Sequence, residues 1–312
     1  MLETAAGVSG QVLTLFLLIG VGVICDRAKI LSHATVRQMT NFLLFFVTPS
    51  VIIHALQMNF DRERAMGLLI AALLAVLAHI VGILLSSAFF RRSSPDQKPV
   101  LRFGIVYSNA GFMALPLTAA IAGTDGVFYG GVFVIVFNLF CWTHGVIIMS
   151  GGKKNMSLKK ALINPGTIGF AVGLPFFLFS IPMPQIPMAA LTHMASLNSP
   201  LAMIVIGTHL SRTNIRTAFA DTRIYAAVAL RLLIVPSLIF AAMFALNRFT
   251  ALSETLVAAL IIPACAPAAA NATLFSDKFN RDTALASKVM VVTTLFSVVT
   301  MPLFVSAAIK LI

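Results

Sequence analysis

The chain has 312 residues, of which 59% are hydrophobic and only 10% are charged, and its formal net charge is +12. Soluble globular domains are about 25% charged, so this composition excludes an ordinary soluble domain and indicates a polytopic membrane protein. The basic residues stand in short clusters between apolar runs, which is the pattern of the positive-inside rule and argues against a nucleic-acid-binding protein.

Ten apolar stretches are long enough to cross a membrane, since a transmembrane helix needs about 20 mostly apolar residues. In chain order they cover approximately residues 8–25, 38–58, 65–90, 99–122, 126–150, 164–182, 187–210, 223–247, 251–275 and 284–310. No basic segment precedes the first stretch, so we expect a retained helix there and not a cleaved signal peptide. The sequence predicts an all-α membrane protein with ten transmembrane helices.

The loop charges predict the orientation of these spans. Most of the basic residues fall on one side: Arg27, Lys29, Arg37, Arg91, Arg92, Lys98, Arg102, Lys153, Lys154, Lys159, Lys160, Arg212, Arg216, Arg223, Lys278 and Arg281. The opposite side holds only Arg62, Arg64, Arg248 and Lys310. We therefore expect the basic side to face the cytoplasm, with both termini outside it, in the plasma (inner) membrane.

Division of the chain near residues 151–164 leaves five spans in each half. Because five is odd, the second half enters the membrane with the opposite topology, which is the plan of inverted-repeat transporters. Weak matches at a separation of about 150–155 residues agree with it, such as Gly20 with Gly173 and Pro49 with Pro200. We expect two inverted five-helix repeats.

The fourth and ninth spans are interrupted at residues 107–116 and 263–272. Gly111 weakens a helix, and Pro116 removes a backbone donor and clashes one turn back. Pro263 and Pro267 have the same effect in the ninth span. Irregular backbone at membrane depth survives only inside protein or beside a water-filled cavity. We therefore expect broken helices 4 and 9, with the first new half-helix starting near Pro116.

A matched pair of broken helices points to the substrate site of a secondary transporter. Each new half-helix presents a positive dipole end and free N–H groups, which favour an anion. Asn109 and Asn271 flank the breaks, and each amide can both donate and accept hydrogen bonds. Alternatively, the prolines only kink packed helices and the asparagines cap loose backbone.

The charged residues of the spans favour an anionic cargo. All ten acidic residues fall at span ends or in loops, whereas Arg231 lies inside the eighth span. A cation at a helix centre costs roughly 2.5–3.5 kcal/mol on insertion scales. Two interpretations of Arg231 stay open, a structural anchor and a contact with the substrate. His79 and His144 lie deep in spans three and five, where they either couple transport to protons or pack as neutral residues.

No glycine-rich phosphate loop, carboxylate pair or His/Cys metal cluster is present in the sequence. Cys25, Cys141 and Cys265 lack the spacing of metal ligands and are expected to be reduced core residues. We expect neither an enzyme nor a cofactor or metal site.

Two stretches resemble the auxin efflux carrier (PIN-like) family. The first is Ser108-Asn-Ala-Gly-Phe-Met-Ala-Leu-Pro-Leu117, followed by Gly123, Asp125-Gly126 and Asn138. The second is Asn164-Pro-Gly-Thr-Ile-Gly-Phe-Ala-Val-Gly173, which is similar to the opening of the sixth span in that family.

The resemblance implies the fold of the bile acid/sodium symporter superfamily. Spans 1, 2, 6 and 7 (residues 1–58 and 159–210) would form a scaffold domain, through which the protein would dimerise. Spans 3–5 and 8–10 (residues 59–158 and 211–312) would form a moving transport domain. The family holds its substrate carboxylate beside the first break, which maps onto Asn109 and the link to Pro116. Similar bacterial members are associated with malate or malonate, and the large central loop of the plant carriers is absent here.

The sequence thus predicts a secondary transporter that carries a small organic anion across a lipid bilayer by an elevator-like motion. The expected substrate-site residues are Asn109, Gly111, Pro116, Asn138, Arg231, Pro263, Pro267 and Asn271. Two alternatives stay open, a sodium-coupled symporter of the same fold and a passive channel or structural membrane protein.

Overall fold

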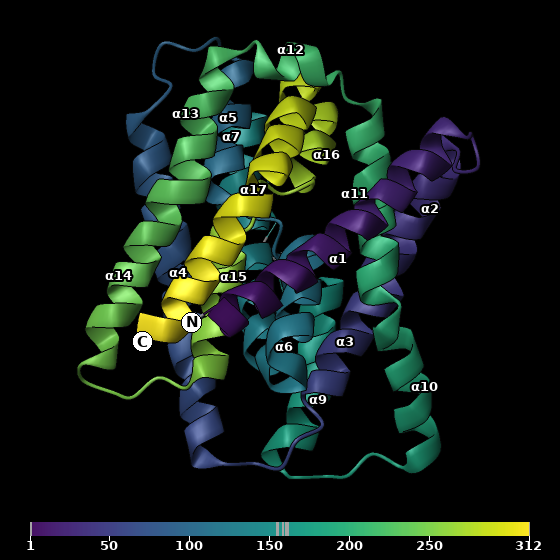
Figure 1. The fold of residues 1–312 in the computed structure, drawn as a ribbon, viewed down its shortest axis with the longest axis vertical. Helices are drawn as coiled ribbons and strands as arrows, with labels where there is room; N and C mark the ends of the chain where they lie inside the picture. Colours follow the sequence, from purple (N-terminus) through teal and green to yellow (C-terminus); the bar gives the residue numbers. More distant parts are fainter. Residues whose placement is uncertain (1, 154–155, 158, 160–161, 312) are drawn as a thin grey trace.

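A computed structural model describes the chain except for residues 1, 154–155, 158, 160–161 and 312, and these described residues contain helices and no β-strand. Within the described part of the chain, seven helical segments are long and apolar enough to cross a membrane: Gly7–Arg27, His33–Ala55, Arg62–Ala88, Ala110–Ser150, Gln185–Arg212, Thr222–Asn247 and Thr283–Lys310. Two shorter apolar helices cover Pro165–Leu178 and Glu254–Cys265. The expected all-α membrane protein is confirmed (Figure 1).

The helices are, in chain order, α1 (Leu2–Arg27), α2 (His33–Phe42), α3 (Thr48–Ala55), α4 (Arg62–Ala88), α5 (Gln97–Val106), α6 (Leu115–Phe140), α7 (Val146–Ser150), α9 (Pro165–Leu178), α10 (Gln185–Ser196), α11 (Asn198–Arg212), α12 (Ile215–Phe219), α13 (Thr222–Ala229), α14 (Val235–Asn247), α15 (Glu254–Cys265), α16 (Asn271–Lys278) and α17 (Thr283–Leu311). Short π-helical turns join several of them: η1 (Leu43–Val47), η2 (Ala110–Ala114), η3 (Cys141–Gly145) and η5 (Leu230–Ile234).

Three of these π-helical turns, η1, η2 and η5, end two residues before a proline, namely Pro49, Pro116 and Pro236. A proline inside a helix lacks an N–H group and clashes with the carbonyl one turn back, and the wider π-helical turn makes room for the proline ring. The helix therefore passes through Pro116 without a break. The expected start of a half-helix near Pro116 is wrong, because the helix already restarts at Ala110.

Helix α6 reverses direction at Gly123, which has φ 62° and ψ −155°. A β-carbon built on Gly130 would lie 3.5 Å from Cγ2 of Thr118. Twelve residues of straight helix would separate these positions by about 18 Å. The segment Ala110–Ser150 therefore folds back on itself as two antiparallel helices.

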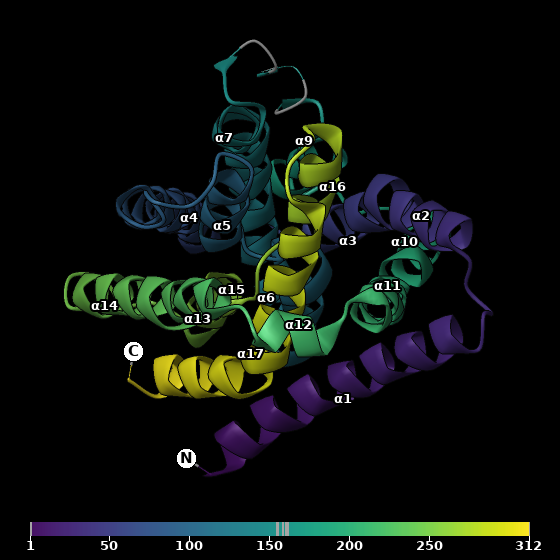
Figure 2. The same ribbon diagram turned by 90° about the horizontal axis from the view of Figure 1, so that it is seen from above.

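The helices form two groups with α6 and α17 between them (Figure 2). One group contains α1, α2, α3, α10 and α11, and the other contains α4, α5, α13, α14 and α15. Helices α1 and α11 cross at very short distance, since a β-carbon on Gly22 or Gly207 would overlap the backbone oxygen of Ile204 or Ile19. The absence of side chains at these two glycines allows the close packing.

Several basic loops gather at the upper end of the molecule in Figure 1, including those after α1, α4 and α11. Lys154 and Lys160, which were counted with this basic side, lie outside the described residues. The cytoplasmic assignment of this end, the ten-span count and the inverted repeat remain predictions.

Candidate functional site

Both predicted interruptions are present, and the two unwound links lie side by side. The first link, Tyr107–Asn109, follows α5, and the second, Ala266–Ala270, separates α15 from α16. They pair as an isolated antiparallel bridge between Ser108 and Ala268. We call this pair of links the crossing.

Backbone hydrogen bonds hold the crossing together. The N–H of Asn109 donates to the carbonyl of Pro267 at 2.7 Å, and the N–H of Ala269 donates to the carbonyl of Tyr107 at 2.9 Å. The N–H of Ala268 donates to Oγ1 of Thr293 on α17 at 3.1 Å. These bonds satisfy unwound backbone that would otherwise be costly in an apolar environment.

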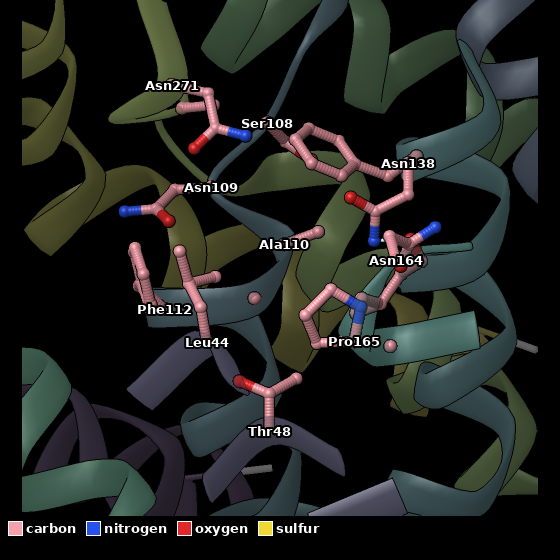
Figure 3. Close-up of a pocket in the computed structure, with 15 residues that line it drawn as sticks. Leu44, Thr48, Ser108, Asn109, Ala110, Phe112, Asn138, Asn164, Pro165 and Asn271 are labelled. Atoms are coloured by element: carbon pink, nitrogen blue, oxygen red, sulfur yellow. Dashed lines mark hydrogen bonds between the residues drawn. The ribbon is translucent and has the colours of Figure 1, made fainter. Parts of the chain in front are cut away.

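A pocket opens beside the crossing (Figure 3) and encloses about 520 Å³ of space, part of it continuous with the outside. Its lining comes from η1, α3, the crossing, η2, α6, α9 and α16: Leu44, Thr48, Ser108, Asn109, Ala110, Gly111, Phe112, Val134, Phe137, Asn138, Asn164, Pro165, Gly166, Ala269 and Asn271. None of these residues is charged.

Four of the six polar residues that line this pocket are asparagines. Asn109 and Asn271 lie on one side of it, and Asn138 and Asn164 lie on the other (Figure 3). Nδ2 of Asn138 donates to the carbonyl of Val134 at 2.9 Å, and Asn164 caps α9 by accepting from the N–H of Thr167.

The side chain of Asn109 is different, because it makes no hydrogen bond within the described part of the chain, although the residue is only 4% exposed. Its donors and its acceptor therefore remain available to a ligand in the pocket.

Three helix N-termini contribute residues to the same pocket. Asn109 and Gly111 open the helix that runs through η2 into α6, Asn271 opens α16, and Asn164 opens α9. The first N–H groups of a helix have no carbonyl one turn back, and the helix dipole gives this end a partial positive charge. The pocket therefore favours an anion without containing a cationic side chain.

The predicted site residues divide into two groups. Asn109, Gly111, Asn138 and Asn271 line the pocket, whereas Pro116, Pro263, Pro267 and Arg231 do not. Pro116 lies within the α6 helix, and Pro263 lies in the last turn of α15. Pro267 is in the second link, where its carbonyl accepts from Asn109.

Arg231 is buried, with 2% of its surface exposed, and lies behind the crossing. Its Nε donates to the carbonyl of Ala266 at 3.0 Å, and its Nη1 donates to that of Ile105 at 3.1 Å. Nη2 donates to the carbonyls of Pro263, at 3.3 Å, and Ala264. The geometry matches the structural interpretation of this arginine and not a contact with the pocket.

His79 and His144 do not line the pocket either, but both are near Tyr107 at the start of the crossing. His79 is 2% exposed and stacks on the ring of Phe140, with ring centroids 5.0 Å apart. Its Nδ1 lies 2.7 Å from the carbonyl of Ala75, and its Nε2 has no described partner. Nδ1 of His144 lies 2.9 Å from the hydroxyl of Tyr107, which also donates to the carbonyl of Phe140.

The sequence-based site list omitted the contribution of α9 and of the η1–α3 region. Asn164-Pro-Gly combines an N-cap residue with a proline at the first helical position, which marks a helix start. This motif locates an N-terminus but does not reveal that it faces the crossing. Thr48 and Leu44 give no comparable signal, because polar and apolar residues of this kind occur throughout the spans.

Comparison with known proteins shows the family of this chain. A sequence model of the family described as membrane transport protein matches residues 7–158 and 153–305. An uncharacterized transporter from Methanothermobacter thermautotrophicus is 26% identical over 309 residues, which is 96% of this chain and 97% of the relative. Because the family match covers nearly the whole sequence, the chain belongs to the membrane transport protein family, which is the family of transporters that resemble the auxin efflux carriers.

Proposed function

We propose that this transporter is a secondary carrier of a small organic anion, and that the carboxylate binds in the pocket beside the crossing. The observation that carries the proposal is the free amide of Asn109 at one of three helix N-termini. A carboxylate there would accept from Nδ2 of Asn109 and from the N–H groups of the opening helical turn. Hydrogen bonds to a charged group contribute about 1.5–3 kcal/mol each.

The neutrality of the pocket agrees with a small carboxylate, such as malate or malonate, as the cargo. No lining residue is acidic, so an anion meets no fixed negative charge. No lining residue is basic, so its affinity would depend on amides and helix dipoles. Such a site holds an anion less tightly than an ion pair would, which agrees with a carrier that must release its cargo.

We further propose the ten-span arrangement of two inverted halves. The reversal at Gly123 supports it, since it divides the segment Ala110–Ser150 into the second part of span four and span five. The two shorter apolar helices, Pro165–Leu178 and Glu254–Cys265, would then be span six and the first part of span nine. The basic loops at one end of the molecule support a cytoplasmic location of that end in the plasma membrane. Both termini would then lie on the opposite, non-cytoplasmic side.

The composition of the pocket wall supports the proposal of an elevator-like motion. Leu44, Thr48 and the start of α9 belong to the predicted scaffold domain. Asn109, Asn138 and Asn271 belong to the predicted transport domain. A bound anion would therefore lie at the boundary between the two, and sliding of the transport domain would carry it across the membrane. We also propose that two copies of the chain dimerise through the scaffold domain, which stays fixed while the transport domain moves.

Proton coupling through His79 is a second candidate feature. The unpartnered Nε2 of His79 supports it, as does the ring of Phe137, which contacts His79 at a centroid distance of 6.3 Å and also lines the pocket. A proton gradient should then accelerate uptake, and His79→Phe should remove that acceleration while exchange of substrate continues.

Counterflow in proteoliposomes tests the carrier function. Vesicles loaded with unlabelled malonate or malate should transiently accumulate the labelled anion from outside, because a carrier exchanges one molecule for another. The neutral diamide of the same acid should not compete. Absence of counterflow for a panel of mono-, di- and tricarboxylates, or flux that follows only the membrane potential, would overturn the proposal in favour of a passive channel or a structural protein.

A further inference from the structure

The guanidinium of Arg231 binds the carbonyl ends of both broken helices at once. Ile105 lies in the last turn of α5, Pro263 and Ala264 lie in the last turn of α15, and Ala266 starts the second link. An arginine has five N–H donors in a planar arrangement. All three of its nitrogens are engaged with main-chain oxygens, and none of these contacts involves the pocket.

The charge of Arg231 is matched by helix dipoles and not by a carboxylate. The ion pairs among the described residues involve Arg64, Arg212, Arg223 and Arg281, but not Arg231. Each helix C-terminus carries about half a negative charge, so the ends of α5 and α15 together supply about one. One guanidinium therefore balances the two converging ends.

Converging carbonyl ends of this kind are otherwise a site for a free cation. In transporters with broken helices, unwound carbonyls and half-helix C-termini coordinate a sodium ion. Here the tethered side chain of Arg231 already occupies that position. The guanidinium cannot leave during a transport cycle, because it is covalently attached to the chain. It is also not neutralised, because it stays charged throughout the accessible pH range.

We propose that Arg231 is a built-in cation that replaces a free sodium or potassium ion at the crossing and locks the two half-helices together. It acts as a positioning residue, because it sets the crossing that presents Asn109 and Asn271 and does not touch the pocket itself. The crossing is then preformed without an external cation. Insofar as the chain carries organic anions as proposed above, that transport is independent of sodium and potassium.

Thermal unfolding of the purified, detergent-solubilised full chain tests the proposal without the need for a substrate. The wild type should have the same melting temperature in sodium, potassium and choline chloride at equal ionic strength. Arg231→Ala leaves the carbonyl ends without a cation, and its melting temperature should fall by about 5 °C or more. Millimolar guanidinium chloride, far below its denaturing range, should restore much of this loss.

Matched variants separate the charge from the packing of this side chain. Arg231→Lys keeps a cation with fewer donors and should be more stable than Arg231→Gln, which is polar but neutral. Arg248→Ala removes an exposed arginine that lies over the ring of Phe244, and guanidinium should not raise its melting temperature. If Arg231→Ala fails to fold, the comparison of the Lys and Gln variants and the cation series on the wild type still decide the matter.

The proposal is overturned if the wild type requires sodium or potassium for stability, if the Lys and Gln variants are equally stable, or if guanidinium stabilises Arg231→Ala no more than Arg248→Ala. Counterflow by the wild type in sodium and in choline chloride adds a functional measurement. Equal rates support the proposal, whereas a several-fold loss without sodium contradicts it. Complete absence of counterflow in both salts would refute the carrier function and leave the unfolding experiment as the test of Arg231.

Discussion

Replacement of Asn109 by alanine tests whether the free amide at the crossing binds the substrate. The side chain makes no hydrogen bond to the described protein, so its removal should leave the folded state almost unaffected. Alanine also adopts the backbone angles of this position, φ −75° and ψ 60°, without left-handed strain. The expected effect is therefore confined to the ligand.

The size of that effect follows from the loss of one hydrogen bond to a charged carboxylate. Such a bond contributes about 1.5–3 kcal/mol, which corresponds to about a 10- to 150-fold weaker affinity. Asn109→Asp should weaken binding further, because it places a negative charge of nearly the same shape beside the anion.

Isothermal titration of the purified protein with the carboxylate that gives counterflow measures this affinity directly. The melting temperature of each variant, and its elution as a single species, controls for folding. Asn59→Ala, at an exposed position outside the pocket, should bind like the wild type. An unchanged affinity in a folded, monodisperse Asn109→Ala protein would refute the assignment of this residue.

Three further predictions concern glycines that shape the fold or line the pocket. Gly22→Ala should cost about 1–3 kcal/mol of stability, because its β-carbon would overlap the backbone of Ile204, whereas Gly20→Ala meets nothing within 4 Å and should be neutral in the same unfolding assay. Gly123→Ala should lower the free energy of unfolding by about 1–3 kcal/mol, since φ 62° with ψ −155° is a conformation that only glycine adopts readily. A variant as stable as the wild type would contradict the reversal of α6 at this residue. Gly111→Ala has space for a β-carbon and should fold normally. Its methyl group would enter the pocket and should reduce the carboxylate affinity in titration. An unchanged affinity would contradict binding of the carboxylate beside Gly111.

The membrane class and the location of the breaks could be predicted from the sequence because both depend on local composition. Long apolar runs indicate spans, and paired prolines and glycines in an apolar run indicate interruptions. The exact limits of the first break were wrong, because the prediction treated Pro116 as the start of a helix. A π-helical turn at Ala110–Ala114 instead carries the helix through the proline, and a proline alone does not distinguish such a turn from the start of a helix.

The role of Arg231 and the full wall of the pocket could not be predicted, since both depend on contacts between distant segments. The carbonyls that Arg231 binds come from Ile105 and from residues 263–266, about 126 and 35 positions away in the chain. Asn164 is predicted at the start of a span, yet nothing local to it indicates that it lies across a pocket from Asn109. Hydropathy gives depth in the membrane, but not the neighbour on the next helix.

The position of the bound carboxylate is the most direct test of the proposed site. A cryo-EM or crystallographic map of the protein saturated with a transported carboxylate would measure it, and a brominated analogue would identify the ligand unambiguously. The proposed function predicts a carboxylate within hydrogen-bonding distance of Nδ2 of Asn109 and of the N–H groups that open η2. Ligand density in contact with the guanidinium of Arg231, or in any pocket away from the crossing, would contradict it.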